Sequence, residues 1–284
     1  MKFKPVIKRS GSKRSQSEEI IKYFPKEINT YYEPFIGGGS VMYQLLNSDI
    51  KVKEYICSDI NQDLINLWNV IKKYPTYISD NYEKMWNELN KDEDIERRKL
   101  YYYHIRNRFN DQRDVADFFF LIRTCTNGLI RYNSKGEFNT SFHFSRKGIN
   151  PKEARKIINE WSNKISESHV RFICQDYRNI NPRENDFVYL DSPYANTTGM
   201  YFGQIDYDEF WDFLRNLKCD YAFSFDGISG DTDNTYDVPK DVYSYHIYTD
   251  AAISGFGKMN KKKKYVRESL YLAYNPYRDI EFKF

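Results

Sequence analysis

Short apolar runs alternate with amphipathic stretches at both ends of this chain. The runs are rich in β-branched and aromatic residues, which predicts strands; they lie at 30–36, 54–58, 170–174, 187–190 and 221–225. Helical patterns occupy 17–24, 40–47 and 206–217, and two further strand-like segments, 243–248 and 269–274, close the chain. Strands that alternate with helices are typical of an α/β fold built on a parallel sheet.

The middle of the chain has a different character, with few strand signals and many Tyr, Asn, Lys and Glu residues. Helical patterns cover 61–73, 77–89, 94–109 and 151–165, and 115–124 is a further apolar stretch. A polar, glycine-marked segment from 127 to 148 is predicted to be a hairpin region. We therefore predict one α/β domain, residues 1–61 and 166–284, interrupted by a mostly helical insertion at 62–165.

Composition narrows the class of protein without identifying it. The 284 residues can form one large domain or a domain that carries an insertion, and the net charge of +3 argues against a polycation but not against a local basic face. No stretch approaches 18 consecutive apolar residues, so we expect no membrane span. The four cysteines form no Cys-x-x-Cys pair, which disfavours a structural zinc site and is compatible with a reduced cytosol.

Asp191-Ser192-Pro193-Tyr194 directly follows the predicted strand at 187–190. In open α/β sheets chemistry takes place at the carboxyl ends of strands. An acid, a carbonyl that precedes a proline and an aromatic ring could bind the amino group of a planar base and stack on the base. An ordinary turn at the end of a strand, with a capping Asp, explains the four residues equally well. Other parts of the chain must therefore distinguish a functional site from a structural turn.

Gly37-Gly38-Gly39 lies between a predicted strand and a predicted helix, where glycines let the backbone approach a ligand closely. Asp59 follows Gly39 by twenty residues, the spacing at which an acid meets a ribose in dinucleotide sites. The glycines do not fit Gly-x-Gly-x-x-Gly, which argues against a nicotinamide dehydrogenase, whereas an adenosine ligand without phosphates does not need that pattern. The alternative role for Asp59 is to cap the helix predicted at 61–73.

Four motifs, taken in order, resemble the Dam-type adenine-specific DNA methyltransferases, a family with solitary bacterial, phage and restriction–modification members. They are Lys8-Arg9-Ser10-Gly11-Ser12-Lys13, Glu33-Pro34-Phe35-Ile36-Gly37-Gly38-Gly39-Ser40, Ser58-Asp59-Ile60-Asn61 and Asp191-Ser192-Pro193-Tyr194. Residues 127–139 are similar to the target-recognition hairpin of that family, and 262–274 to its closing basic loop and strand.

The resemblance implies a Rossmann-like sheet that binds S-adenosyl-L-methionine, with a helical target-recognition domain inserted before the catalytic tetrapeptide. The implied reaction is methyl transfer to the exocyclic amino group of a flipped-out adenine in double-stranded DNA. The implied catalytic residues are Asp191, Ser192, Pro193 and Tyr194. The implied cofactor-binding residues are Arg9, Lys13, Glu33, Phe35, Gly37, Gly39, Asp59, Asp176, Tyr177 and Asp191. Lys8, Arg9, Lys13 and Arg14 could instead form a phosphate-binding arm.

For DNA binding, the resemblance points to residues of the hairpin and of a lysine-rich loop at 261–264, the lysine loop. The residues are Asn127, Arg131, Asn133, Lys135, Arg146, Lys147, Lys262 and Lys263. Arginine pairs with guanine and asparagine with adenine, although phosphate contact is the more frequent role of any single residue. We expect Arg146 to be a base reader, the lysine loop to contact the backbone, and the target to be a short site that contains GATC or part of it.

Two positions depart from the family pattern: Ser192 stands where Pro is usual, and Arg9 where an aromatic residue is common. Serine also supplies the backbone carbonyl that the reaction uses. Two alternatives stay open: an amino methyltransferase for cytosine N4 or RNA, and a catalytically silent DNA-binding relative. We expect a cytoplasmic monomer or weak dimer in a bacterial or phage-infected cell, with a cognate restriction endonuclease as a conceivable second partner.

Overall fold

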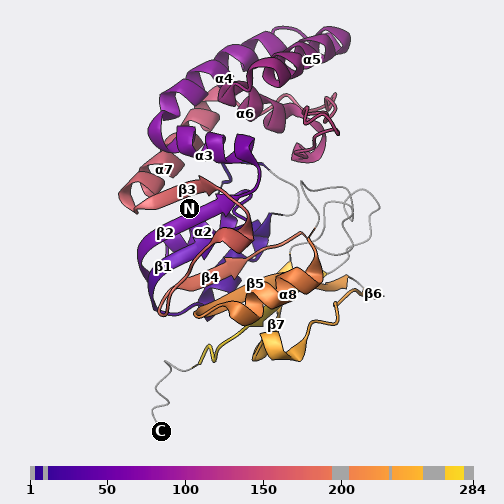
Figure 1. Ribbon diagram of the computed structural model, residues 1–284. Helices are drawn as coiled ribbons and strands as arrows, with labels where there is room; N and C mark the ends of the chain where they lie inside the picture. The colour runs from indigo at the N-terminus through magenta and orange to yellow at the C-terminus, as the bar shows by residue number, and fades with distance from the viewer. Residues whose placement is uncertain (1–3, 9–11, 194–204, 230–231, 252–265, 278–284) are drawn as a thin grey trace.

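The sheet forms the lower part of the computed structural model, which describes residues 4–8, 12–193, 205–229, 232–251 and 266–277 (Figure 1). Its strands are β1 (Glu27–Glu33), β2 (Lys51–Asp59), β3 (Val170–Cys174), β4 (Phe187–Leu190), β5 (Asp220–Ser229), β6 (Thr232–Asp233), β7 (Tyr245–Ala251) and β8 (Val266–Leu272). Their spatial order is β3-β2-β1-β4-β5-β8-β7, and β6 pairs with β5. The predicted strand bounds are close to the observed ones, although β1 already ends at Glu33 and residues 34–36 belong to the following turn.

The first five strands of that order are parallel, and they follow the Rossmann sequence of strands. The strand β8 is antiparallel to both of its neighbours, β5 and β7. The predicted α/β, Rossmann-like fold is therefore confirmed. Because strand order reverses between β1 and β4, the carboxyl ends of these two strands flank the crevice where such sheets bind ligands.

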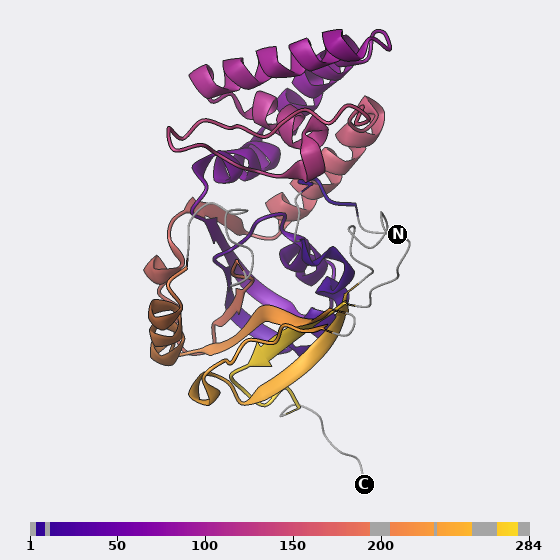
Figure 2. The ribbon, with the colours of Figure 1, turned by 90° about the vertical axis from the view of Figure 1, so that its right-hand side faces the viewer.

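Both faces of the sheet are covered, which explains why its central strands are continuously apolar. Along β4, Phe187 and Tyr189 join one buried cluster, whereas Val188 and Leu190 join another. The helices α1 (Ser17–Ile20) and α2 (Ser40–Leu46) pack on the first face and α8 (Tyr207–Asn216) on the second, as Figure 2 shows for α2 and α8.

Five helices lie between β2 and β3, in the segment predicted as the insertion. They are α3 (Gln62–Lys73), α4 (Pro75–Leu89), α5 (Ile95–Gln112), α6 (Val115–Thr124) and α7 (Pro151–Glu167). Figure 1 shows α4, α5 and α6 at the end of the molecule away from β7, with α3 and α7 between them and the sheet. The rings of Trp68 and Trp161 pack with centroids 5.1 Å apart and share one buried cluster with Tyr31 of β1. Since the core is continuous, the division into two domains stays a prediction.

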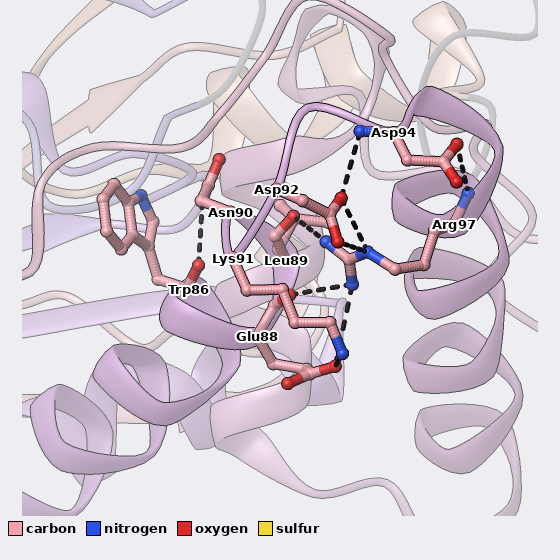
Figure 3. A network of polar contacts seen from close by, with 8 residues as sticks. All are labelled: Trp86, Glu88, Leu89, Asn90, Lys91, Asp92, Asp94 and Arg97. Carbon is pink, nitrogen blue, oxygen red and sulfur yellow. Dashed lines mark hydrogen bonds and ion pairs between the residues drawn. The ribbon is translucent and has the colours of Figure 1, made fainter.

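The turn between α4 and α5 is fixed by Arg97 (Figure 3). Its guanidinium donates to the carbonyl oxygens of Glu88 and Leu89, both at 2.9 Å, and to Asp92. A cation therefore satisfies the last carbonyls of α4, as helix C-termini require. Asp94 caps α5 through the amides of residues 96 and 97. The ordered turn also contacts the predicted hairpin, since Glu93 binds Lys147 at 2.6 Å.

Candidate active site and nucleic-acid interface

Three acids meet at one edge of the sheet, because each stands at the carboxyl end of a parallel strand. Glu33 ends β1, Asp59 ends β2, and Asp191 follows β4 directly. β1 pairs with both of the other strands, so the acids lie beside the point where strand order reverses. The structure thus brings together the cofactor and catalytic candidates of three separate motifs.

Lys13 reaches this edge from the N-terminal segment, where it begins a 3-10 turn, η1 (Lys13–Ser15). Its ammonium lies 2.5 Å from Asp191 Oδ1 and 3.1 Å from Glu268 Oε2, and the side chain is only 5% exposed. Burial alone would lower the pKa of Lys13, but the two carboxylates raise it above its usual value. The alternative in which Lys13 is part of a flexible phosphate-binding arm is therefore wrong, because its ammonium is buried and contacts two carboxylates of the protein.

Glu33 is buried beneath the same edge. The Tyr31 hydroxyl donates to Glu33 Oε2 at 2.8 Å. Burial raises the pKa of the Glu33 carboxyl to about 8; the negative charge of Asp191 adds to this rise and the Tyr31 hydrogen bond opposes it. Glu33 is consequently protonated at neutral pH, and a cation bound nearby would favour its ionisation.

The turn after β1 requires glycine at two places. Gly39 is the N-cap of α2 with φ of 65°, and a Cβ atom there would lie 2.9 Å from Trp68 Cζ2. Gly37 has φ of 46°, and its carbonyl accepts a hydrogen bond from Trp68 Nε1 at 3.1 Å. Any other residue would strain the backbone at both positions, and at Gly39 it would also displace the tryptophan.

Asp59 holds that turn from the neighbouring strand. Its Oδ2 accepts from the Gly37 amide at 3.2 Å, and its Oδ1 accepts from the Asn61 amide at 3.0 Å. The side chain that caps α3 is Asn61, which accepts from the Leu64 amide at 3.1 Å. The alternative role of Asp59 as the helix cap is therefore wrong.

Two further cofactor candidates, Asp176 and Tyr177, lie just after β3, and Phe35 lies in the turn after β1. The ring of Phe35 is 5.3 Å from that of Tyr177, which also packs on Phe210 of α8. Asp176 accepts from the amide and from the side chain of Arg178, at 2.9 and 2.8 Å. The two rings form an aromatic wall, whereas contact between Asp176 and a ligand stays a prediction.

The predicted catalytic tetrapeptide is described as far as Pro193. The Pro193 carbonyl accepts from the Tyr207 hydroxyl at 3.1 Å, which fixes the turn to the start of α8. The Ser192 side chain is buried, and its hydroxyl has no hydrogen-bond partner among the residues that the structure describes. The candidates Arg9, Tyr194, Lys262 and Lys263 lie outside the described residues.

The predicted hairpin is a loop whose two arms meet at isolated bridges rather than along regular strands. These bridges join Cys125 to Phe142 and Tyr132 to Phe138. The Tyr132 hydroxyl donates to Asp63 Oδ2 of α3 at 2.7 Å, a contact that the sequence did not suggest. Separate backbone hydrogen bonds, such as that from the Asn139 amide to the Arg131 carbonyl at 3.0 Å, join the arms, and aromatic packing and the Tyr132 contact support them.

The polar hairpin candidates make internal contacts of their own. Asn133 Oδ1 accepts from the amides of Lys135 and Glu137, which closes the turn at the tip. Arg131 donates to Asn139 at 2.8 Å, and Arg146 to the Cys125 carbonyl at 3.0 Å. Arg131 and Lys135 are exposed, as is Asn127, which adopts φ of 56°. The hairpin is thus ordered before it meets a partner.

Two glycines with positive φ fix the two ends of this hairpin. A Cβ atom on Gly128 would lie 2.7 Å from the Lys8 carbonyl oxygen, and one on Gly148 would lie 2.6 Å from the Tyr82 hydroxyl. That hydroxyl also donates to the Ile149 carbonyl at 2.9 Å. One end of the hairpin is therefore packed against the N-terminal segment and the other against α4.

A basic cluster lies where the N-terminal segment meets the hairpin. Burial lowers the pKa of Lys8, and the positive charges of Arg146 and Arg123 lower it further. Arg123, buried on α6, donates to the carbonyls of Pro5 and Val6. The sequence did not reveal Arg123, because it stands in an apolar run.

Residues 10–266 match the family model of the D12 class N6 adenine-specific DNA methyltransferases. The chain belongs to this family. Its activity is adenine methylation of DNA, which decides against cytosine N4 and RNA as targets. Among the residues that the structure describes, no group of His, Cys, Asp and Glu could hold a metal ion, and no described helix is long and apolar enough to cross a membrane.

Curated relatives agree with the family assignment. A type II methyltransferase, M.MjaIII of Methanocaldococcus jannaschii, is 35% identical over 73% of this chain and 75% of its own length. The DNA adenine methylase of Haemophilus influenzae is 34% identical over 69% of this chain and 65% of its own, and that of Serratia marcescens 33% over 68% of each. Among solved structures, the rRNA methyltransferase aviRa from Streptomyces viridochromogenes covers 90% of this chain and 80% of its own at 12% identity, with a TM-score of 0.39.

Proposed function

We propose that this chain methylates the exocyclic amino group of a flipped-out adenine in double-stranded DNA, with S-adenosyl-L-methionine as the methyl donor. The observation that carries the proposal is the placement of Asp191, at the carboxyl end of β4 and bound to the buried Lys13 at 2.5 Å. An acid in this position lies beside the crevice of an α/β sheet, where a donor and an acceptor can meet.

The residues beside the crevice fit such a donor. The turn at Gly37 and Gly39 has backbone conformations that bring main chain close to a ligand, and Glu33 is a buried acid suited to a cationic one. Asp59 would bind the ribose, and Phe35 with Tyr177 the adenine ring of the donor. Asp176, Arg9 and Lys13 complete the proposed cofactor set. The bound cofactor would supply the methyl group.

The chain itself would prepare the acceptor. The Asp191 carboxylate and the Ser192 carbonyl would each accept a hydrogen bond from the adenine amino group, whose lone pair is otherwise delocalised into the ring. These bonds favour tetrahedral geometry at nitrogen and direct its lone pair to the methyl carbon, so that positioning provides much of the acceleration. As the N–C bond forms, nitrogen loses one of its two protons, and Asp191 is the base already hydrogen-bonded to it. Tyr194 would stack on the flipped base.

The hairpin and the basic cluster would hold the DNA. Lys8 and Arg146 lie near the buried Arg123, and the exposed side chains of Arg131 and Lys135 add positive charge along the hairpin. Phosphate contacts would supply affinity and base contacts specificity. We propose that the protein acts as a monomer or weak dimer in the cytoplasm. A cognate endonuclease stays a proposal, motivated by the type II methyltransferase among its relatives.

The test measures methyl transfer from labelled donor to duplex DNA, followed by sequencing that maps the methylated bases. We expect N6-methyladenine at one short motif and no transfer by Asp191→Ala, which should still bind donor and DNA. Asp241→Ala is the matched control, because it removes an exposed acid that pairs with Arg215. Methylated cytosine, or an Asp191→Ala variant that works at the wild-type rate, would overturn the proposal.

A further inference from the structure

Glu268 is an acid at this site that was not among the predicted site residues, although it lies within the closing segment 262–274. It lies on β8, the strand inserted antiparallel between β5 and β7, where it pairs with Thr249 in register. Its carboxylate is 3.1 Å from the ammonium of Lys13, and the same ammonium is 2.5 Å from Asp191. A single buried cation therefore bridges the proposed catalytic acid and a residue far from it in sequence.

We propose that Glu268 is a positioning residue for methyl transfer: it holds the ammonium of Lys13 against Asp191 and thereby fixes the carboxylate that receives the adenine amino group. The inference rests on the proposed role of Asp191. Glu268 itself touches neither the base nor the donor in this account. It acts through Lys13.

The physical need for a second acid follows from the chemistry of lysine. An ammonium is a compact charge with three donors at the end of a flexible stem, so one carboxylate does not define its position. A second carboxylate on the other side restricts it, and charge-assisted hydrogen bonds to both acids are stronger than neutral ones. Because Lys13 is almost completely buried, water cannot replace either partner without cost.

The elements that carry the two residues differ in rigidity. Lys13 begins a three-residue 3-10 turn, whereas Glu268 belongs to a strand that is hydrogen-bonded on both sides. A second link joins the same parts of the chain: Gln16 donates to the Thr249 hydroxyl at 3.3 Å, and that hydroxyl donates to the Glu268 carbonyl at 3.4 Å. The sheet thus positions the lysine, and the lysine positions Asp191.

Electrostatics at this edge also require the bridge. Asp191 faces two other ionisable groups, Glu33 on β1 and Tyr189 on β4, and each disfavours additional negative charge. Without the ammonium, the carboxylate of Asp191 would be repelled by Glu268 and, when it is ionised, by Glu33. The ammonium of Lys13 offsets this repulsion and holds the carboxylates of Asp191 and Glu268 in place.

The test is Glu268→Gln, which keeps the size of the side chain and one acceptor oxygen but removes the charge. We expect kcat to fall by roughly tenfold to a hundredfold, the cost of a misplaced reacting group, while KM for DNA and for donor change by less than about twofold. The matched control is Glu54→Gln, which removes an acid on β2 that pairs with Arg171 at 2.9 Å on the surface of the same sheet. The control should keep wild-type kcat.

A double-mutant cycle with Lys13→Met separates positioning from a general loss of stability. If Glu268 acts only through Lys13, adding Glu268→Gln to Lys13→Met should lower kcat by less than about threefold. Urea unfolding of each variant checks that the fold is intact. Full additivity of the two effects, or a Glu268→Gln enzyme with raised donor KM and unchanged kcat, would overturn the inference.

The outcome also distinguishes this inference from the function on which it rests. If the wild-type protein transfers no methyl group to DNA, the proposed function fails. If the wild type is active and Glu268→Gln has the same kcat and KM values, the proposed function stands and only the role of Glu268 is excluded.

Discussion

Replacing Glu33 by glutamine should remove a pH-dependent loss of stability from the ligand-free protein. The folded pKa of Glu33 is about 8, whereas an ordinary glutamate has 4.5. Between these values the folded state binds one proton more than the unfolded state, so the free energy of unfolding falls as pH rises. The stabilisation that comes from the protonated Glu33 carboxyl is fully present below the unfolded pKa and is lost as pH rises above the folded pKa.

The size of the effect follows from the two pKa values. Each pKa unit corresponds to about 1.4 kcal/mol, so Glu33 should lower the free energy of unfolding by roughly 3 kcal/mol at pH 7 and by about 5 kcal/mol above pH 8. Glutamine stays neutral throughout and its amide oxygen can still accept from the Tyr31 hydroxyl. Glu33→Gln should therefore be more stable than the wild type at neutral and alkaline pH.

The assay is urea unfolding of both proteins, without ligand, from about pH 5 to about pH 9. The difference in the free energy of unfolding should grow with pH and level off near the folded pKa. Tyr31→Phe is a second probe. The hydrogen bond from the Tyr31 hydroxyl favours the ionised Glu33 carboxyl, so its removal should shift the pH-dependent change in stability to higher pH. Wild type and Glu33→Gln with parallel pH profiles would refute the reasoning.

Four further outcomes are expected. Asp59→Ala should weaken donor binding by roughly tenfold to a hundredfold, and calorimetry that shows unchanged affinity would remove Asp59 from the site. Ser192→Pro should keep kcat within about threefold, because the backbone carbonyl survives and the serine hydroxyl has no partner among the described residues. Gly148→Ala should lower the free energy of unfolding by about 1–3 kcal/mol, measured in urea, because its φ is 74° and its Cβ would meet Tyr82. Arg146→Ala should relax the methylated motif at one base pair, whereas Lys262→Ala with Lys263→Ala should lower the salt slope by about two and leave the motif unchanged in sequencing.

Local patterns were sufficient for most of the sheet. The strand at 187–190 has the same bounds as β4, because four apolar residues between an acid and a proline can be buried on both faces. The turn at Gly37 was predicted from its run of three glycines, and Gly37 and Gly39 both adopt the positive φ that glycine takes without strain. The family resemblance assigned Glu33, Asp59 and Asp191 to one site, and the structure shows them at one edge because parallel strands end there.

Contacts between distant segments could not be predicted in this way. No local pattern relates Lys13 to Glu268, because their meeting depends on the antiparallel insertion of β8. Asp59 and Asn61 both suit a helix cap, and only the structure shows that Asn61 has that role. The hairpin region was predicted, but the absence of regular strands from it was not. Its arms meet at isolated bridges, supported by aromatic packing and by the contact between Tyr132 and Asp63.

The N-terminal segment explains how recognition and chemistry can influence each other. Lys8 packs its carbonyl against Gly128 at the start of the hairpin, and five residues later Lys13 binds Asp191. Five residues span at most about 18 Å when fully extended, so we expect a displacement of the hairpin by a wrong base pair to reach the proposed catalytic acid along the chain. Gln16 links the far side of this segment to Thr249 of β7 through a hydrogen bond of 3.3 Å. A wrong base pair should therefore lower kcat as well as affinity, and single-turnover rates on matched and mismatched duplexes at saturating protein would separate the two effects.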